Sequence, residues 1–146
     1  MDMKSEELAY MAGLFDGEGS IYIGKASSHR QQLYSVCLSI TNTDKDVLQW
    51  AVEHFGGAVS LKPAERAHYK TRYLWRAQAI RNTAIVLEQI LPFLKIKKQQ
   101  ALLALRFLKL QIGKNRKRPR YNLEELELLS AYCNEMHILN KRGSRL

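Results

Sequence analysis

The sequence has few of the residues that stabilise a fold from outside its hydrophobic core. It contains only two cysteines, Cys37 and Cys133, so a disulfide scaffold is excluded and cysteine alone cannot complete a structural zinc site. The four histidines show no metal-ligand spacing. A chain of 146 residues buries roughly 70% of its unfolded surface in one core, so it needs neither device to fold.

Long hydrophobic runs and flexible linkers are also missing. No apolar run approaches the ~20 residues that span a bilayer. The N-terminal segment MDMKSEELAY carries acidic residues in place of the apolar centre of a secretory signal. No stretch rich in Pro, Gly or Ser is long enough to divide the chain. We therefore expect a single soluble domain over residues 1–146, in a reducing compartment and without a membrane partner.

Negative charge is scarce relative to positive charge. The chain has 23 Lys and Arg against 14 Asp and Glu, a formal net charge of +9, with globular proportions of 46% hydrophobic and 25% charged residues. This excess favours a polyanionic partner, because binding to phosphates releases their counterions. An anionic membrane surface is the alternative, but no basic amphipathic helix with an aromatic face stands out.

The first third of the chain predicts a helix followed by a hairpin. Ser5 is a plausible N-cap for a helix over about 6–15, where apolar residues recur at helical spacing. After Gly19 the period changes to two, first over 20–24 and again over 33–41. Two alternating runs joined by a polar segment indicate an antiparallel hairpin with one buried face and one wet face.

The rest of the chain repeats this pattern and then becomes helical. Thr43 and Asp46 resemble the capping box of a second helix that Gly56 and Gly57 end. The alternation, turn and capping signals that follow predict strands at 58–62 and 73–80, helices at 83–91 and 97–112, a basic loop at 113–120 and a last helix at 122–139. The order predicts an α+β fold: a four-stranded antiparallel sheet with helices on one face.

Two acidic residues, Asp16 and Glu18, lie at the end of the first predicted helix, each followed by glycine. Helix termination by Gly17 is one interpretation. Yet a helix C-terminus carries partial negative charge, which disfavours further anions. A hard divalent cation would make these carboxylates favourable, because Mg²⁺ binds carboxylates, backbone carbonyls, waters and substrate phosphates.

The segment MAGLFDGEG, residues 11–19, resembles the nine-residue LAGLIDADG motif of the homing endonucleases, and PFLKIK at 92–97 extends the likeness. The final acid of the motif is usually Asp, and here it is Glu18. The resemblance implies an αββαββα fold in which a motif helix over 6–19 leads into a saddle-shaped sheet, with extra C-terminal helices.

The resemblance also implies an activity: a site-specific double-strand DNA endonuclease of intron homing that hydrolyses a long pseudo-palindromic target with a divalent metal. A chain with one motif is expected to act as a homodimer, in the cytoplasm of a bacterium or phage host or in an organelle. Two alternatives stay open. One is an intron maturase that binds RNA and assists splicing, and the other is a DNA-binding protein that has lost cleavage.

In similar enzymes the motif acids hold metal and the motif helices pair. The resemblance therefore assigns Mg²⁺ to Glu18 and the Gly17 carbonyl; Mn²⁺ is expected to substitute, and Ca²⁺ to bind without supporting cleavage. It assigns catalytic roles to Glu18, to Lys97 at the edge of the site, and to Asn42, which would position water. Asp16 is expected to support helix packing. The residues expected at the dimer interface are Leu8, Met11, Ala12, Gly13, Phe15 and Asp16.

The wet face of a twisted sheet can lie along the major groove and present alternate side chains to the bases. By this alternation and by charge, the sequence nominates residues of the wet face, of the hairpin tips and of the basic loop for DNA binding. They are Tyr22, Gly24, Ser35, Cys37, Ser39, Arg76 and Gln78 on the face, Lys25, Ser27, Arg30, Gln32, Lys62, Arg66, Lys70 and Arg72 at the tips, and Arg116, Lys117 and Arg118 in the loop.

Overall fold

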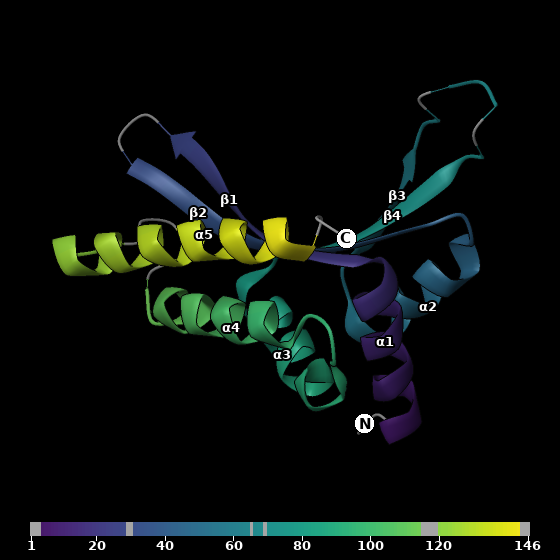
Figure 1. Cartoon of the computed structure of the whole chain (residues 1–146), viewed down its shortest axis with the longest axis horizontal. Helices are drawn as coiled ribbons and strands as arrows, with labels where there is room; N and C mark the ends of the chain where they lie inside the picture. The colour runs from purple at the N-terminus through teal and green to yellow at the C-terminus, as the bar shows by residue number, and fades with distance from the viewer. Residues whose placement is uncertain (1–3, 29–30, 65, 69, 115–119, 144–146) are drawn as a thin grey trace.

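The computed structural model describes residues 4–28, 31–64, 66–68, 70–114 and 120–143, without the side chains of 26–28, 31–33 and 142–143. The elements run in the predicted order, with one short 3-10 turn added (Figure 1). They are α1 (Ser5–Glu18), β1 (Gly19–Ser28), β2 (Gln31–Asn42), α2 (Lys45–Phe55), β3 (Ala58–Lys62), β4 (Arg72–Ala77), α3 (Ile80–Ile90), η1 (Leu91–Phe93), α4 (Lys98–Ile112) and α5 (Leu123–Gly143).

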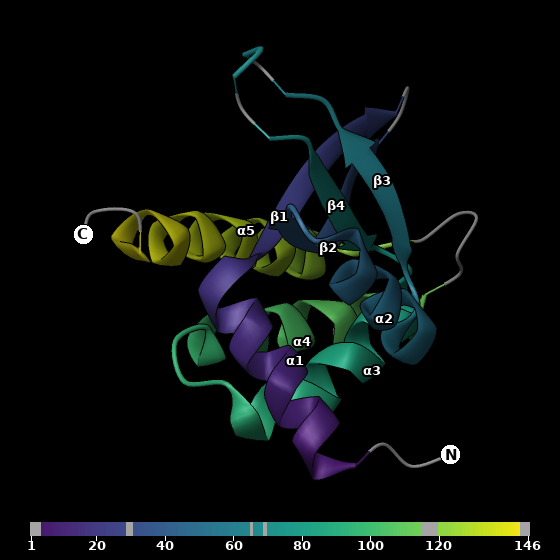
Figure 2. The same ribbon diagram turned by 90° about the vertical axis from the view of Figure 1, so that its right-hand side faces the viewer.

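The four strands form one antiparallel sheet in the order β1-β2-β4-β3. The two hairpins meet where Leu38–Asn42 of β2 pairs with Tyr73–Ala77 of β4, and from there they rise as two wings (Figure 1). The helices lie beneath this saddle and leave its upper face open (Figures 1 and 2). The predicted fold class and the one-sided helical layer are confirmed.

The core fills the space between the sheet and the helices. Alternate strand residues, such as Ile21, Leu38, Ile40 and Trp75, are at most 1% exposed and face the helical layer. Trp75 also donates from its ring nitrogen to the Gly56 carbonyl at 2.9 Å, so its polar group is satisfied inside the core. This burial of one face only is what the period-two pattern predicts.

The turn from α1 into β1 depends on Gly19. A Cβ on Gly19 would lie 2.6 Å from the Phe15 carbonyl oxygen, closer than any side chain can approach. The Gly19 amide itself donates to this carbonyl and so ends the helix. The chain therefore passes directly from the last turn of α1 to a strand, which places Glu18 at the junction of the helix and the sheet.

The start of α2 differs from the prediction. Asp44, and not Thr43, is the N-cap, and its carboxylate accepts hydrogen bonds from the amides of Asp46 and Val47. Asp46 lies in the first turn instead of capping it. Thr43 and Asp44 are both good capping residues, and the length of β2, which runs to Asn42, decides between them.

The return strand of the second hairpin is shorter than predicted. Pairing with β2 ends at Ala77 and pairing with β3 ends at Arg76, so Gln78 has no strand on either side. Helix α3 begins at Ile80, three residues before its predicted start. Gln78 is therefore exposed in the connection and not part of the open face of β4.

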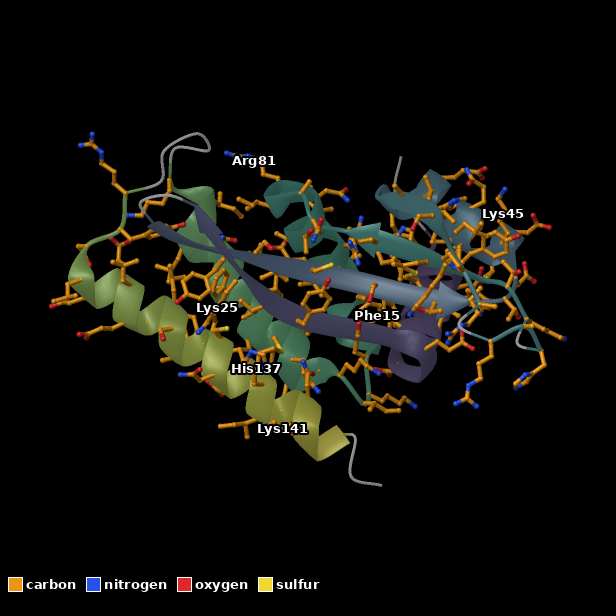
Figure 3. The ribbon with its side chains drawn as sticks, turned by 90° about the horizontal axis from the view of Figure 1, so that it is seen from above. Phe15, Lys25, Lys45, Arg81, His137 and Lys141 are labelled. Atoms are coloured by element: carbon orange, nitrogen blue, oxygen red, sulfur yellow. The ribbon has the colours of Figure 1, made fainter. Side chains whose placement is uncertain are left out.

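The long C-terminal helix covers the free edge of β1, and Figure 3 shows it running beside this strand. Asn140 donates its side-chain amide to the Ile21 carbonyl at 2.9 Å, and the Cys133 thiol points to the Ile23 carbonyl at 3.6 Å. Both cysteines are buried and free. An edge strand that is covered in this way cannot pair with another chain. Among the described helices, none is long and apolar enough to cross a membrane.

Candidate active site and nucleic-acid-binding face

Three segments that are far apart in the sequence meet where α1 enters the sheet. Glu18 is the last residue of α1 and is exposed, and Asn42 is the last residue of β2. The Asn42 side-chain amide donates to Glu18 Oε2 at 2.5 Å. Lys97, at the start of α4, contacts the last turn of α1, because its ammonium donates to the Asp16 carbonyl at 2.7 Å. The structure thus gathers all three predicted catalytic residues at the lower end of the motif helix.

Asp16 links this helix to α4. Its carboxylate accepts from the backbone amides of Lys95 at 2.8 Å and Lys97 at 3.0 Å. Helix α4 has no capping side chain of its own, since its N-cap residue is Lys97. Asp16 therefore satisfies amides at the start of α4 from another helix, and its negative charge is favourable there. These bonds to the start of α4 are the way in which Asp16 contributes to the packing of α1.

The Lys97 ammonium is partly withdrawn from solvent. Burial lowers the pKa of Lys97 below its usual value, and the charge of Asp16 opposes this effect. The ammonium faces one of the last carbonyls of α1, where the partial negative charge of the helix end attracts a cation. Lys97 thus brings a positive group onto the helix turn that ends at Glu18.

The donor set at the end of α1 suits a hard cation. Glu18 and Gly17 are both exposed and offer carboxylate and carbonyl oxygens, which are the ligands that Mg²⁺ prefers. Mg²⁺ keeps several waters and usually needs only one or two protein carboxylates. Among the described residues of one chain, no three His, Cys, Asp or Glu side chains gather into a metal cluster. The Asp16 carboxylate is bonded to the amides of Lys95 and Lys97, so Glu18 is the acid of this helix end that faces solvent.

Asp16→Ala is expected to lower the free energy of unfolding by about 2 kcal/mol, because two backbone amides lose a charged acceptor. Asp46→Ala is a matched control, since Asp46 is exposed in the first turn of α2, and its cost should stay within about 0.5 kcal/mol. Urea denaturation of both variants measures the difference. Equal stabilities would contradict the capping role of Asp16.

The predicted dimer interface is corrected for Met11, Ala12 and Phe15. All three are 0% exposed and belong to the core of their own chain, so they have no surface to offer a second copy. Leu8 is half-buried, and Asp16 is bonded to α4. Of the predicted interface residues, Gly13 is the exposed one.

The exposed side of α1 carries a different set of residues. Ala9, Gly13 and Gly17 follow one another at intervals of four and are all exposed, so they form one stripe along the helix. A Cβ added to Gly13 or Gly17 would meet nothing within 4 Å. Tyr10 lies beside the stripe and is 55% exposed. In Figure 2 no other element stands in front of α1. The interval of four was visible in the sequence and identifies this stripe.

The open face of the sheet holds part of the nominated set of nucleic-acid contacts. On this face Ser35 and Arg76 are exposed, and Tyr22, Gly24 and Ser39 are half-exposed. Lys25 is exposed but shares the phase of the buried Ile23, and its ammonium lies 6.0 Å from the centre of the Tyr34 ring, so it is not on the open face. On the second hairpin Arg66 and Lys70 are exposed, and Lys62 and Arg72 are half-exposed. The side chains of Ser27, Arg30, Gln32, Arg116, Lys117 and Arg118 lie outside the described part of the chain.

The prediction that Cys37 contacts DNA from the open face is wrong. This residue has the alternation of the open face, yet it is 0% exposed, because Tyr22 lies opposite it and the two side chains are hydrogen-bonded. This hydrogen bond and partial burial raise the pKa of Tyr22, while the nearby Arg76 guanidinium lowers it. Alternation identified the face correctly and could not show that one side chain covers another.

The prediction missed several exposed residues of the open face, among them Ser20, Ala58 and Ser60. Ser20 pairs with Ser39 across the strands, and their hydroxyl oxygens are 2.6 Å apart. Ser20 is exposed and shares the period-two phase of Tyr22 and Gly24, so the same alternation would have included it.

No protein-family model matches the chain, and no curated protein sequence matches it. Several solved structures do match the chain. The homing endonuclease I-CvuI, solved with its target and calcium, superposes with a TM-score of 0.74 at 21% identity, over 92% of this chain and 82% of that one. The archaeal intron-encoded homing endonuclease I-Vdi141I, solved with DNA, gives 0.75 at 18% identity, over 94% and 86%.

Longer enzymes match over part of their length. The LAGLIDADG homing endonuclease I-GzeII, solved with its DNA target, gives a TM-score of 0.69 at 14% identity, over 86% of this chain and 43% of that one. These likenesses define the class of structure: the chain has the fold of the LAGLIDADG homing endonucleases.

Proposed function

We propose that this protein is a site-specific double-strand DNA endonuclease that hydrolyses phosphodiesters with a divalent metal ion. One observation carries the proposal. The acid of the motif, Glu18, is exposed at the end of α1 and is hydrogen-bonded to Asn42, and Lys97 is anchored on the same helix end. The residues that the motif assigns to phosphodiester hydrolysis thus meet in space although they are far apart in the chain.

The open face of the saddle supports DNA as the substrate. A curved antiparallel sheet presents alternate side chains to the major groove, and Arg76 is a suitable donor for guanine. The basic residues of the hairpins would contact phosphates and position the duplex. The net charge of +9 favours such binding, and the neighbours I-CvuI, I-Vdi141I and I-GzeII were solved with DNA.

The metal is proposed to be Mg²⁺, held by Glu18 and the Gly17 carbonyl, with Mn²⁺ as a substitute and Ca²⁺ binding without cleavage. When bound, it would supply an activated water and offset charge on the phosphate oxygens. Lys97 places a fixed positive charge beside the phosphate, where it stabilises the charge of the transition state. I-CvuI was solved with a DNA target in 2 mM calcium, and also in 2 mM magnesium, where the DNA was not cleaved.

A homodimer would complete this site, because one chain contributes a single acid. The exposed stripe of Ala9, Gly13 and Gly17 allows a second α1 to approach closely, which would bring two copies of Glu18 together near a two-fold axis. The lengths of the matched enzymes support a homodimer. The chain spans 82% of I-CvuI but only 43% of I-GzeII, which has room for two units of this size. A two-fold dimer implies a pseudo-palindromic target.

I-Vdi141I and I-CeuI are described as intron-encoded, and we extend the role of intron homing to this chain as part of the proposal. Such an enzyme acts on genomic DNA, so we place it inside the cell, in the cytoplasm or in an organelle.

Incubation with a library of long pseudo-palindromic duplexes tests the proposed activity. We expect cleavage of both strands at one site in the presence of Mg²⁺ and none when the metal is chelated, with the cut ends mapped by sequencing. Tight binding of a duplex without cleavage in Mg²⁺ or Mn²⁺ would contradict the nuclease and indicate a DNA-binding protein of the same fold. Selective binding of structured RNA alone would indicate the maturase.

A further inference from the structure

The acid of this motif is one methylene longer than the usual aspartate, and a second side chain touches it. Glu18 would by itself leave three side-chain torsions free on an exposed surface, at a cost in entropy whenever it is ordered around a metal. In the structure one of its oxygens, Oε2, is already held by the Asn42 amide. The extra length of Glu18 is what brings its carboxylate to the end of β2.

The orientation of the Asn42 amide follows from its other contact. The Asp44 backbone amide, which can only donate, points to Asn42 Oδ1 at 2.8 Å, so the oxygen of the side chain must lie on that side. The NH₂ group must then face Glu18 and can only donate to it. Asp44 is in turn fixed as the N-cap of α2. The contact to Glu18 is thus held in place by the start of a helix.

We propose that Asn42 is a positioning residue for Glu18, and that the two side chains are matched in length. Asn42 holds Oε2 and fixes the direction of the other carboxylate oxygen, Oε1, which forms no hydrogen bond among the described residues and is the one that would bind the metal. This inference rests on the proposed function. It differs from the water-positioning role that the motif assigns to Asn42, because the partner of the amide is the carboxylate itself.

Two substitutions that exchange the side-chain lengths at positions 18 and 42 test this match between Glu18 and Asn42. Glu18→Asp shortens the acid by about 1.5 Å, and Asn42→Gln lengthens the amide by the same amount. We expect Glu18→Asp alone, Asn42→Gln alone and Asn42→Ala alone to lower the affinity for Ca²⁺ and the rate of cleavage by about 10- to 100-fold each, the usual effect of losing a partner of a metal ligand. We expect the double variant Glu18→Asp/Asn42→Gln to recover most of this loss.

Two controls distinguish a loss of Glu18 positioning from a loss of the folded structure. Asn134→Ala removes an exposed asparagine of α5 and should change neither quantity. Thermal unfolding is measured for every variant, and Glu18→Asp, which leaves the Asn42 contact to Asp44 in place, should keep the midpoint of the unsubstituted protein. The Asn42 side-chain NH₂ signal in metal-free NMR spectra, assigned by its loss in Asn42→Ala, should shift in Glu18→Asp.

The readouts distinguish the two proposals. If no duplex is cleaved by the unsubstituted protein, the proposed function fails, while Ca²⁺ affinity and the NH₂ signal still decide the role of Asn42. If cleavage occurs, but the NH₂ signal is unchanged in Glu18→Asp and the losses of the single variants add in the double variant, the pairing of Asn42 with Glu18 is refuted.

Discussion

Glu18→Gln is expected to reduce strand cleavage by about 10³-fold or more and to leave folding and DNA affinity unchanged. The substitution keeps the shape of the side chain and removes its negative charge, which is the part that binds a divalent cation. The carbonyl oxygen of the substituted side chain can still accept from Asn42, so the local structure is preserved. Because Glu18 is exposed, no buried polar group is left without a partner.

Single-turnover cleavage of the duplex selected from the library measures this effect, with DNA affinity measured in Ca²⁺-free buffer. Glu88→Gln is the matched control, since Glu88 is an exposed acid on α3 that forms no ion pair among the described residues, and it should cleave normally. Cleavage by Glu18→Gln within tenfold of the unsubstituted rate would remove Glu18 from the metal site.

Gly13→Leu is expected to convert a dimer into a folded monomer. In one chain a Cβ at Gly13 meets nothing within 4 Å, so the monomer accommodates the new side chain, and replacing glycine within a helix favours folding by about 0.5 to 1 kcal/mol. Between two close-packed helices the same side chain would force the backbones apart. We expect the dimer dissociation constant to rise by about 100-fold or more, a loss of roughly 3 kcal/mol of packing.

Analytical ultracentrifugation gives the mass, and circular dichroism verifies that the helices are retained. Gly113→Leu is the control, because Gly113 is exposed at the end of α4 and a Cβ there also meets nothing within 4 Å. It should stay dimeric. If the unsubstituted protein and Gly13→Leu have the same mass, the stripe on α1 is not the contact between two copies.

Local patterns were sufficient for the parts of the fold that depend on neighbours in the chain. The change from period 3.6 to period two near Gly19 located the junction of α1 and β1 to within a few residues. The two glycines after α2 ended it as predicted, since both have the positive φ that favours glycine. Glu18 and Gly17 could be nominated from the sequence, because the spacing of acids and glycines in the motif is itself local.

Errors arose where two local choices were equally good. Thr43 and Asp44 both suit an N-cap, and pairing of β2 as far as Asn42 selected Asp44. Helix α1 carries small or apolar residues on both sides, so its sequence could not show which side meets the core. In the structure Met11 and Phe15 are buried in the core, and Gly13 is exposed.

From its sequence alone, this protein is a basic α+β chain with one motif whose acid, Glu18, ends a helix, because helical and strand periods and motif spacings are properties of adjacent residues. Tertiary structure decided which atoms meet Glu18 and its neighbour Asp16. The bond from Asn42 crosses 24 residues, and those from Lys95 and Lys97 to Asp16 cross 79 and 81. Contacts across such separations depend on how sheet and helices pack, which no short window of sequence contains.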